Sequence, residues 1–146
     1  MAYLHDAPVR DALRTRIRLL KPDAPRRWGK MTVDQMLWHV SESLRAALGQ
    51  THPHVVKPPL PRALLRFLVL NVPWPRGAPT HPDFVAGDRY GFEEEKIRCL
   101  NFIEAFAQKS LDAEWPESAT LGPMTGRSWS RLQAKHLDHH LRQFGA

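Results

Sequence analysis

The chain has 146 residues, enough for one domain with a hydrophobic core that folds without disulfides or a structural metal. Its one cysteine, Cys99, excludes an internal disulfide framework and any cysteine-rich zinc or iron–sulfur site. Lysine and arginine outnumber the acidic residues by 21 to 15, but the basic residues are scattered singly, and this pattern does not favour nucleic acid as a partner.

The sequence contains no feature that points to a membrane. No apolar run reaches the roughly 20 residues of a membrane span. The opening stretch MAYLHDAPVR resembles neither a signal peptide nor a transit peptide. We therefore expect a soluble protein of the reducing cytoplasm, without a membrane partner.

Two amphipathic helices are expected before residue 50. In the first, residues 6–20, apolar side chains recur every three to four positions until Pro22 ends the pattern. The second, residues 32–48, opens with TVDQ, in which Thr32 and Gln35 can form a capping box. Both helices therefore have an apolar face that must pack against other elements.

Residues 50–87 differ in composition from the rest of the chain. Most of the 13 prolines fall in this segment and interrupt regular structure. One short helix, residues 61–71, is expected within it. A connection this long inside a small domain usually serves as a lid or a crossover.

Two more helices are expected after this connection. Residues 88–110 carry acids in the first turns and Lys109 near the end, as the helix dipole favours. Residues 125–143 form the last helix, with Thr125 as its cap. Four amphipathic helices without a convincing strand predict an all-α fold, a four-helix bundle with one long crossover, in a single domain of residues 1–146.

The last helix carries a cluster of histidines in the stretch KHLDHHLRQFG. At about 100° per residue, His136 and His140 fall within about 20° of Trp129, at the centre of the inward face, with Gln143 close by. His139 lies at the margin of that face. We therefore expect His136 and His140, but not His139, to converge on one point.

This pair of histidines has the spacing of metal ligands. Two imidazoles four residues apart on one helix face can reach a single ion, and His39 on the second helix offers a third ligand. Three neutral imidazoles suit Zn²⁺, Ni²⁺ or Fe²⁺ and leave coordination positions open, as a catalytic site requires. The alternative is a hydrogen-bonded histidine cluster without a metal, because buried imidazoles need partners in either case.

These residues resemble the DinB-like superfamily of damage-inducible proteins, which are four-helix bundles with a metal on three histidines. The stretch MTVDQMLWHV supplies His39 where the second helix of the family places its first ligand. The stretch HLDHHLRQFG matches the family's His-x₃-His-x₂-Gln signature at His136, His140 and Gln143. The phrases RRWGKMTVDQML and HLDHHLRQFG look closer still to one branch of the superfamily, a domain of unknown function.

The resemblance implies a metal triad of His39, His136 and His140, with zinc or nickel as the expected metal and iron as an alternative. Some members of the superfamily are thiol transferases that join a low-molecular-weight thiol to an electrophile. Others are assigned as metal-dependent hydrolases or isomerases. The resemblance therefore implies a metal-dependent transferase or hydrolase acting on a small molecule, with a low-molecular-weight thiol as one candidate substrate.

Other residues are candidates for the surroundings of the metal. Gln143 is expected to orient a ligand, and His139, Trp129 and Gln35 are expected behind the ligands or in the pocket. For a general base, Glu42 is the nearest candidate, although a solvated or supporting carboxylate is the commoner role of such a residue. Further candidates for lining the cleft are Trp28, His54 and His81.

Two other functions stay open at this point. A non-catalytic bundle would dimerise or dock to a partner through exposed apolar residues of 64–70, with or without a metal. A nucleic-acid-binding protein would use the arginine-rich first helix, and its affinity would fall steeply with salt. Cys99 stands among apolar positions and is expected to be a core residue instead of a nucleophile.

Overall fold

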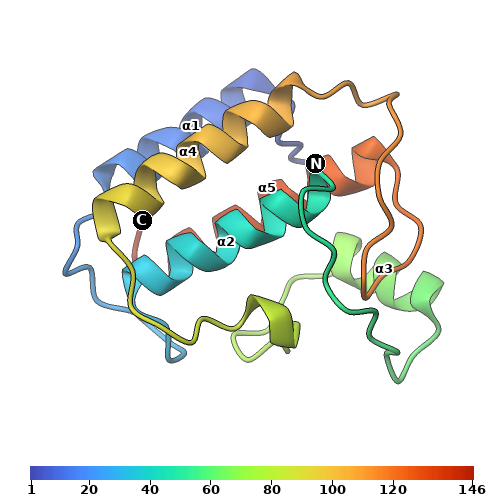
Figure 1. The fold of residues 1–146 in the computed structure, drawn as a ribbon, viewed down its shortest axis with the longest axis horizontal. Helices are drawn as coiled ribbons and strands as arrows, with labels where there is room; N and C mark the ends of the chain where they lie inside the picture. Colours follow the sequence, from blue (N-terminus) through green and yellow to red (C-terminus); the bar gives the residue numbers. More distant parts are fainter.

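The computed structural model describes residues 1–146, and it is all-helical, as expected. The helices, shown in Figure 1, are α1 (Ala7–Leu19), α2 (Val33–Ala47), α3 (Arg62–Asn71), α4 (Phe92–Gln108) and α5 (Gly126–Gln143), with the short 3-10 helix η1 (Pro82–Phe84). The one strand-like contact is an isolated bridge between Ser118 and Gly122. None of the helices combines the length and the apolar character that crossing a membrane requires.

The four longer helices pack around a common core. α2 lies against α4 and α5, and α1 lies against the same two helices. In Figure 1, α1 and α4 run side by side, with α2 and α5 below them. The segment between α2 and α4 lies outside this group, because α3 packs on α5 and η1 packs on α2.

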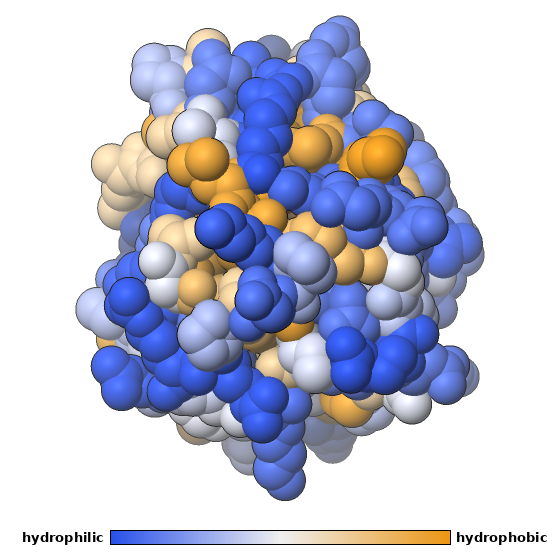
Figure 2. Space-filling model, turned by 90° about the vertical axis from the view of Figure 1, so that its left-hand side faces the viewer, coloured by the Kyte–Doolittle hydropathy of each residue, from blue (hydrophilic) through white to orange (hydrophobic).

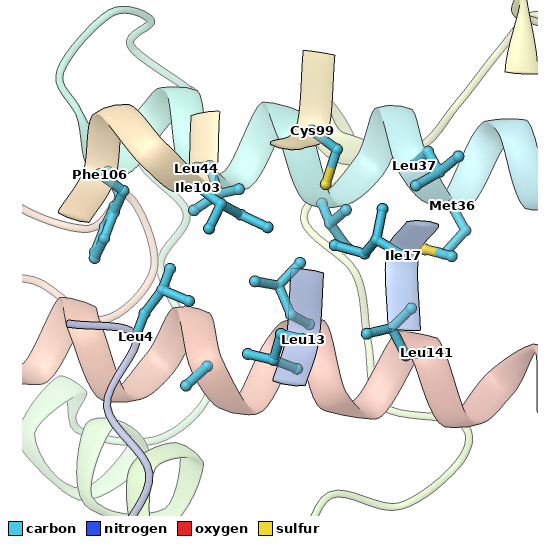
Figure 3. Packing of buried hydrophobic residues seen from close by; sticks show 14 of the residues in the cluster. Leu4, Leu13, Ile17, Met36, Leu37, Leu44, Cys99, Ile103, Phe106 and Leu141 are labelled. Atoms are coloured by element: carbon cyan, nitrogen blue, oxygen red, sulfur yellow. The ribbon is translucent and has the colours of Figure 1, made fainter. Parts of the chain in front are cut away.

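The core is one cluster of buried apolar side chains to which all four longer helices contribute. Figure 3 shows these side chains pointing into the space between the helices, and its labels mark Leu4, Leu13, Ile17, Met36, Leu37, Leu44, Cys99, Ile103, Phe106 and Leu141. Cys99 is fully buried among them, and burial raises the pKa of its thiol to about 12. The expectation of an unreactive core cysteine is confirmed.

Large apolar side chains are exposed in several parts of the molecule, α3 among them. At the end shown in Figure 2, most residues are hydrophilic and the apolar ones form separate patches. α3 lies toward the opposite end (Figure 1), and its side chains Leu64 and Phe67 are 46% and 59% exposed. The exposed apolar residues expected within 64–70 are therefore present.

Sequence signals at the starts of two helices are confirmed. The N–H of Thr32 donates to Gln35 Oε1 at 3.0 Å, which is the glutamine half of the capping box. The hydroxyl of Thr125 accepts from the N–H of Ser128 at 3.1 Å and caps α5. These caps stabilise the first turns of the two helices that carry the histidines.

α4 begins later than the sequence predicts, at Phe92 instead of residue 88. The residues before it are held against α2 by the buried carboxylate of Asp34. This carboxylate accepts two hydrogen bonds of 3.0 Å from Arg89 and one of 2.8 Å from the N–H of Tyr90. The prediction of the start was wrong because these contacts between distant residues outweigh the local helical pattern.

Lys135 of α5 attaches the C-terminal end of α3 to α5. Lys135 Nζ donates to the carbonyl oxygens of Val69, at 2.6 Å, and of Val72. A helix C-terminus favours a cation because its last carbonyl groups lack partners within the helix. The same ammonium lies 5.1 Å from the ring centroid of Trp74. These contacts place Trp74 beside the middle of α5.

Candidate metal centre

α2 and α5 lie antiparallel, and their facing sides bring three histidines together. His39 comes from α2, and His136 and His140 come from successive turns of α5. Their potential ligand atoms all lie within 4.8 Å of one another, and the Nε2 atoms of His39 and His136 are 2.9 Å apart. The structure thus brings together the three histidines expected to form the triad, and they could hold a metal ion.

In two of these rings, a hydrogen bond determines which nitrogen faces the cluster. His39 Nδ1 lies 2.8 Å from the carbonyl oxygen of Phe84, an acceptor, so Nδ1 carries the proton and Nε2 has a free lone pair. In the same way, His140 Nδ1 donates to Gln143 Oε1 at 2.8 Å. A metal-bound imidazole has the same arrangement, with the metal on one nitrogen and a hydrogen-bond acceptor at the other.

Burial keeps all three imidazoles neutral. It lowers the pKa of His39 and of His136, and it lowers the pKa of His140 to about 3, with the neighbouring imidazoles adding to the shifts of His136 and His140. Neutral imidazole is the form that binds metals. At neutral pH the cluster therefore offers uncharged nitrogen donors, a set that suits borderline divalent transition metals.

Hydrogen bonds within the cluster leave one ring nitrogen without a partner. Since His39 presents a lone pair, His136 Nε2 must donate to it at 2.9 Å, and the buried Nδ1 of His136 then has no partner. An unsatisfied buried nitrogen argues against a closed histidine network. In a tetrahedral site with metal–nitrogen bonds of about 2.0–2.1 Å, ligand nitrogens lie about 3.3 Å apart, so small adjustments would admit an ion here.

Gln143 connects the cluster to the loop between α1 and α2. Its Oε1 accepts from His140, and its Nε2 donates to the carbonyl oxygen of Trp28 at 2.9 Å. Gly29 permits this approach, since its φ is +79° and a Cβ there would lie only 2.6 Å from Gln143 Nε2. The structure therefore places Gln143 where it orients the ring of His140.

Aromatic rings border the cluster on α5. The ring centroid of Trp74 lies 5.9 Å from that of His136 and 5.4 Å from that of His139. Trp28 packs edge-on against His139 at 5.6 Å and has the guanidinium of Arg76 at 5.0 Å from its ring. His139 is therefore buried between two tryptophans, beside the triad and not part of it.

Two other predicted residues make structural contacts. Glu42 lies one turn after His39, but its carboxylate forms an ion pair with Arg98 of α4. Gln35 uses Oε1 in the capping box, and its Nε2 donates to the carbonyl oxygen of Asp88 at 2.9 Å. Neither side chain belongs to the group that could hold a metal.

Trp129 borders a cavity instead of the triad. Its indole N–H donates to the carbonyl oxygen of Pro116 at 2.8 Å, and its ring lines a cavity of about 360 Å³. His81 lines the same cavity. His54 does not, because its exposed ring pairs with Asp83.

Two contributors to the site were not predicted, the carbonyl group of Phe84 and the ring of Trp74. Both lie in the proline-rich segment of residues 50–87, whose path is set by contacts with α2 and α5. The proline-flanked tryptophan in VPWPRG was an available signal, since a large ring in such a segment requires a packing partner. A backbone carbonyl has no side-chain signal, and only the fold identifies it.

Comparison of the chain with known protein families, with curated proteins and with solved structures finds no match. The features of the chain that bear on its function are therefore the two sequence motifs and the burial, the hydrogen bonds and the neutral state of His39, His136 and His140.

Proposed function

We propose that the protein is a DinB-like four-helix bundle that binds one divalent transition metal, zinc or nickel, through His39, His136 and His140. One observation carries this proposal. Three neutral imidazoles from two helices converge, and hydrogen bonds leave two of them with a free lone pair on Nε2. The packing of the four longer helices around one core supports the bundle architecture.

We further propose that the metal serves a transferase or hydrolase reaction on a small molecule. Three protein ligands leave coordination positions open, so the bound ion would hold a thiolate at neutral pH or lower the pKa of a bound water to about 7. The chain's own groups hold the ligands in place, the carbonyl of Phe84 for His39 and the amide of Gln143 for His140. The ring of Trp74 covers part of the cluster on the side of His136.

A non-catalytic function is the second candidate, and the surface of α3 favours it. None of its residues is fully buried, and Leu64 and Phe67 are largely exposed. A protein that dimerises or docks to a partner would cover these side chains. The metal would then stabilise the fold without turning over a substrate.

Elemental analysis tests the metal site. Protein purified without a histidine tag should contain one equivalent of zinc or nickel, and the double variant His136→Ala/His140→Ala should lose it. The control variant His52→Ala/His54→Ala, which changes two exposed histidines, should keep the metal. Substoichiometric metal that stays unchanged in the double variant would contradict the proposal.

Cobalt substitution distinguishes the enzyme from the docking module. In the cobalt-loaded protein, addition of a small thiol should change the visible absorption spectrum, because a thiolate can enter an open position. An unchanged spectrum, together with a dimer in analytical ultracentrifugation, would favour the non-catalytic function.

A further inference from the structure

The cavity of about 360 Å³ lies along the same helix interface as the histidine cluster. On α2 it begins at Ser43, one turn after His39. On α5 it begins at Leu132, one turn before His136, and it extends to Trp129. Because α2 and α5 are antiparallel, the turn after His39 and the turn before His136 lie on the same side of the cluster. The cavity therefore starts about one helical pitch, 5.4 Å, from the cluster and extends away from it.

Two loops and one aromatic residue contribute to the lining of the cavity. One loop contributes residues 51–53 and Val55, and the other contributes residues 116–120. A backbone hydrogen bond of 2.9 Å from Val56 to Ala119 joins the two loops. The ring of Phe84 lines the cavity, and its carbonyl group accepts from His39 Nδ1. An occupant would therefore contact the residue that holds one ligand of the proposed metal.

Hydrophobic residues are a minority of those that line the cavity, and the lining includes two large aromatic rings and one arginine. Trp129 and Phe84 supply the rings. Arg62 makes one long contact, from Nη2 to the carbonyl oxygen of Val56 at 3.5 Å, and it takes part in no ion pair. Glu117 is the one carboxylate of the lining, and it is exposed to solvent. Most donors of the Arg62 guanidinium are thus free for a ligand, and a guanidinium recognises a carboxylate through two parallel hydrogen bonds.

We propose that this cavity binds a small organic anion with an aromatic body, the anionic group on Arg62 and the body against Trp129 and Phe84. The cavity has a size typical of small-molecule sites, which are about 300–1,000 Å³. The net charge of +6 favours the approach of an anion. The inference rests on the proposed function only in assigning this anion as the substrate of the metal centre, since binding itself requires no metal.

Calorimetric titration with 3-phenylpropanoate and its neutral analogue 3-phenylpropanamide tests the proposal. Wild-type protein should bind the acid about tenfold more tightly than the amide, because the carboxylate gains charge-assisted hydrogen bonds. Arg62→Gln should abolish this preference. Arg127→Gln, which removes an exposed arginine outside the cavity, should retain it. Equal affinity of wild-type protein for acid and amide would overturn the proposal.

A second variant tests the location without changing a charge. Ala46 lines the cavity on α2, so Ala46→Phe should fill it and weaken binding of the acid at least tenfold. Ala105→Phe places the same side chain on the exposed face of α4 and should bind as wild type does. Thermal unfolding of each variant confirms that it is folded. A folded Ala46→Phe variant that binds the acid with wild-type affinity would overturn the proposal.

The same titrations separate this inference from the proposed metal function. They are repeated with chelator-treated protein and with His136→Ala/His140→Ala. If the acid binds and the wild-type protein as purified holds no metal, the cavity site is supported and the metal function is wrong. If one equivalent of metal binds and the acid does not, the cavity inference alone is wrong.

Discussion

Single residues outside the triad hold two of its imidazoles, those of His39 and His140, with Nε2 toward the cluster. The proton of His39 lies on the nitrogen facing the Phe84 carbonyl, and the proton of His140 lies on the nitrogen facing Gln143. Gln143 in turn is held by the carbonyl of Trp28, and Gly29 leaves the room that this contact requires. Changes at these supporting positions should therefore affect metal affinity without removing any ligand.

Replacement of Gly29 by alanine tests this dependence. In Gly29→Ala, the new Cβ would lie 2.6 Å from Gln143 Nε2, so the amide must move and His140 loses its orientation. We expect metal affinity, measured by competition with a chromophoric chelator, to fall about 10- to 100-fold. The matched control is Gly49→Ala, where φ is also positive, at +75°, but no atom lies within 4 Å of the new Cβ. It should lose about 1–2 kcal/mol of stability and no metal affinity. The idea fails if both variants bind metal equally well.

Contacts with the longer helices organise the proline-rich segment. Lys135 of α5 holds the C-terminal end of α3, and Asp34 of α2 holds the residues before α4. Burial alone would raise the pKa of Asp34, but hydrogen bonds from Arg89 and from the N–H of Tyr90 outweigh it and lower the pKa to about 2. The ionised carboxylate therefore stabilises the end of the segment against α2.

Asp34→Asn should weaken this attachment. We expect the free energy of unfolding at pH 7, measured with urea, to fall by about 1–2 kcal/mol, because the charge-assisted bonds with Arg89 are lost. The carboxylate has a lower pKa in the folded state than its usual 3.8, so its contribution is present above pH 3.8 and is lost as the pH falls toward 2. The difference from wild type should shrink over that range. A difference independent of pH would contradict the assignment.

A surface carboxylate provides the control for this variant. Asp11 is largely exposed and lies 3.7 Å from Arg14. Asp11→Asn should change the free energy of unfolding by less than about 0.5 kcal/mol, because solvent screens an exposed ion pair. An equal loss in both variants would show that the burial of Asp34 has no effect.

In the whole molecule, the histidine cluster joins parts of the chain that lie far apart in sequence. α2 and α5 supply the imidazoles, η1 supplies the carbonyl of Phe84, and the loop after α1 contacts Gln143. A metal at this point would link all four parts. Metal binding and global stability should therefore be coupled, since an ion that binds the folded chain shifts the folding equilibrium.

Removal of the metal should lower the thermal stability. At a free metal concentration 100-fold above Kd, binding contributes about 2.7 kcal/mol, which corresponds to roughly 5–10 °C in Tm for a chain of this size. Scanning calorimetry with and without a chelator measures the difference. His136→Ala/His140→Ala should show no effect of the chelator. A chelator effect of equal size in this variant would place the metal elsewhere.

The metal-free protein should also be sensitive to mild acid. Burial lowers the pKa of the three histidines below their usual 6.5, to about 3 for His140, so the unfolded chain binds more protons between these values. The contribution of these histidines to the free energy of unfolding should be complete above pH 6.5 and should decrease as the pH falls below that value. Urea denaturation of chelator-treated protein at pH 7.5 and 5.5 checks this, and equal stability at both values would contradict it.

The sequence alone predicts the all-α class, the approximate bounds of the helices and the shared inward face of His136 and His140. These features depend on local rules, since apolar periodicity, caps and the phase of side chains around a helix are set by residues near one another in the chain. The grouping of His39 with this pair rests on the resemblance to a known family, because local rules do not relate two separate helices. Tertiary contacts set the start of α4, the path of residues 50–87, and the positions of Phe84 and Trp74 around the triad. Those features depend on contacts between distant residues, and a backbone carbonyl or a cavity wall has no signature in the order of side chains.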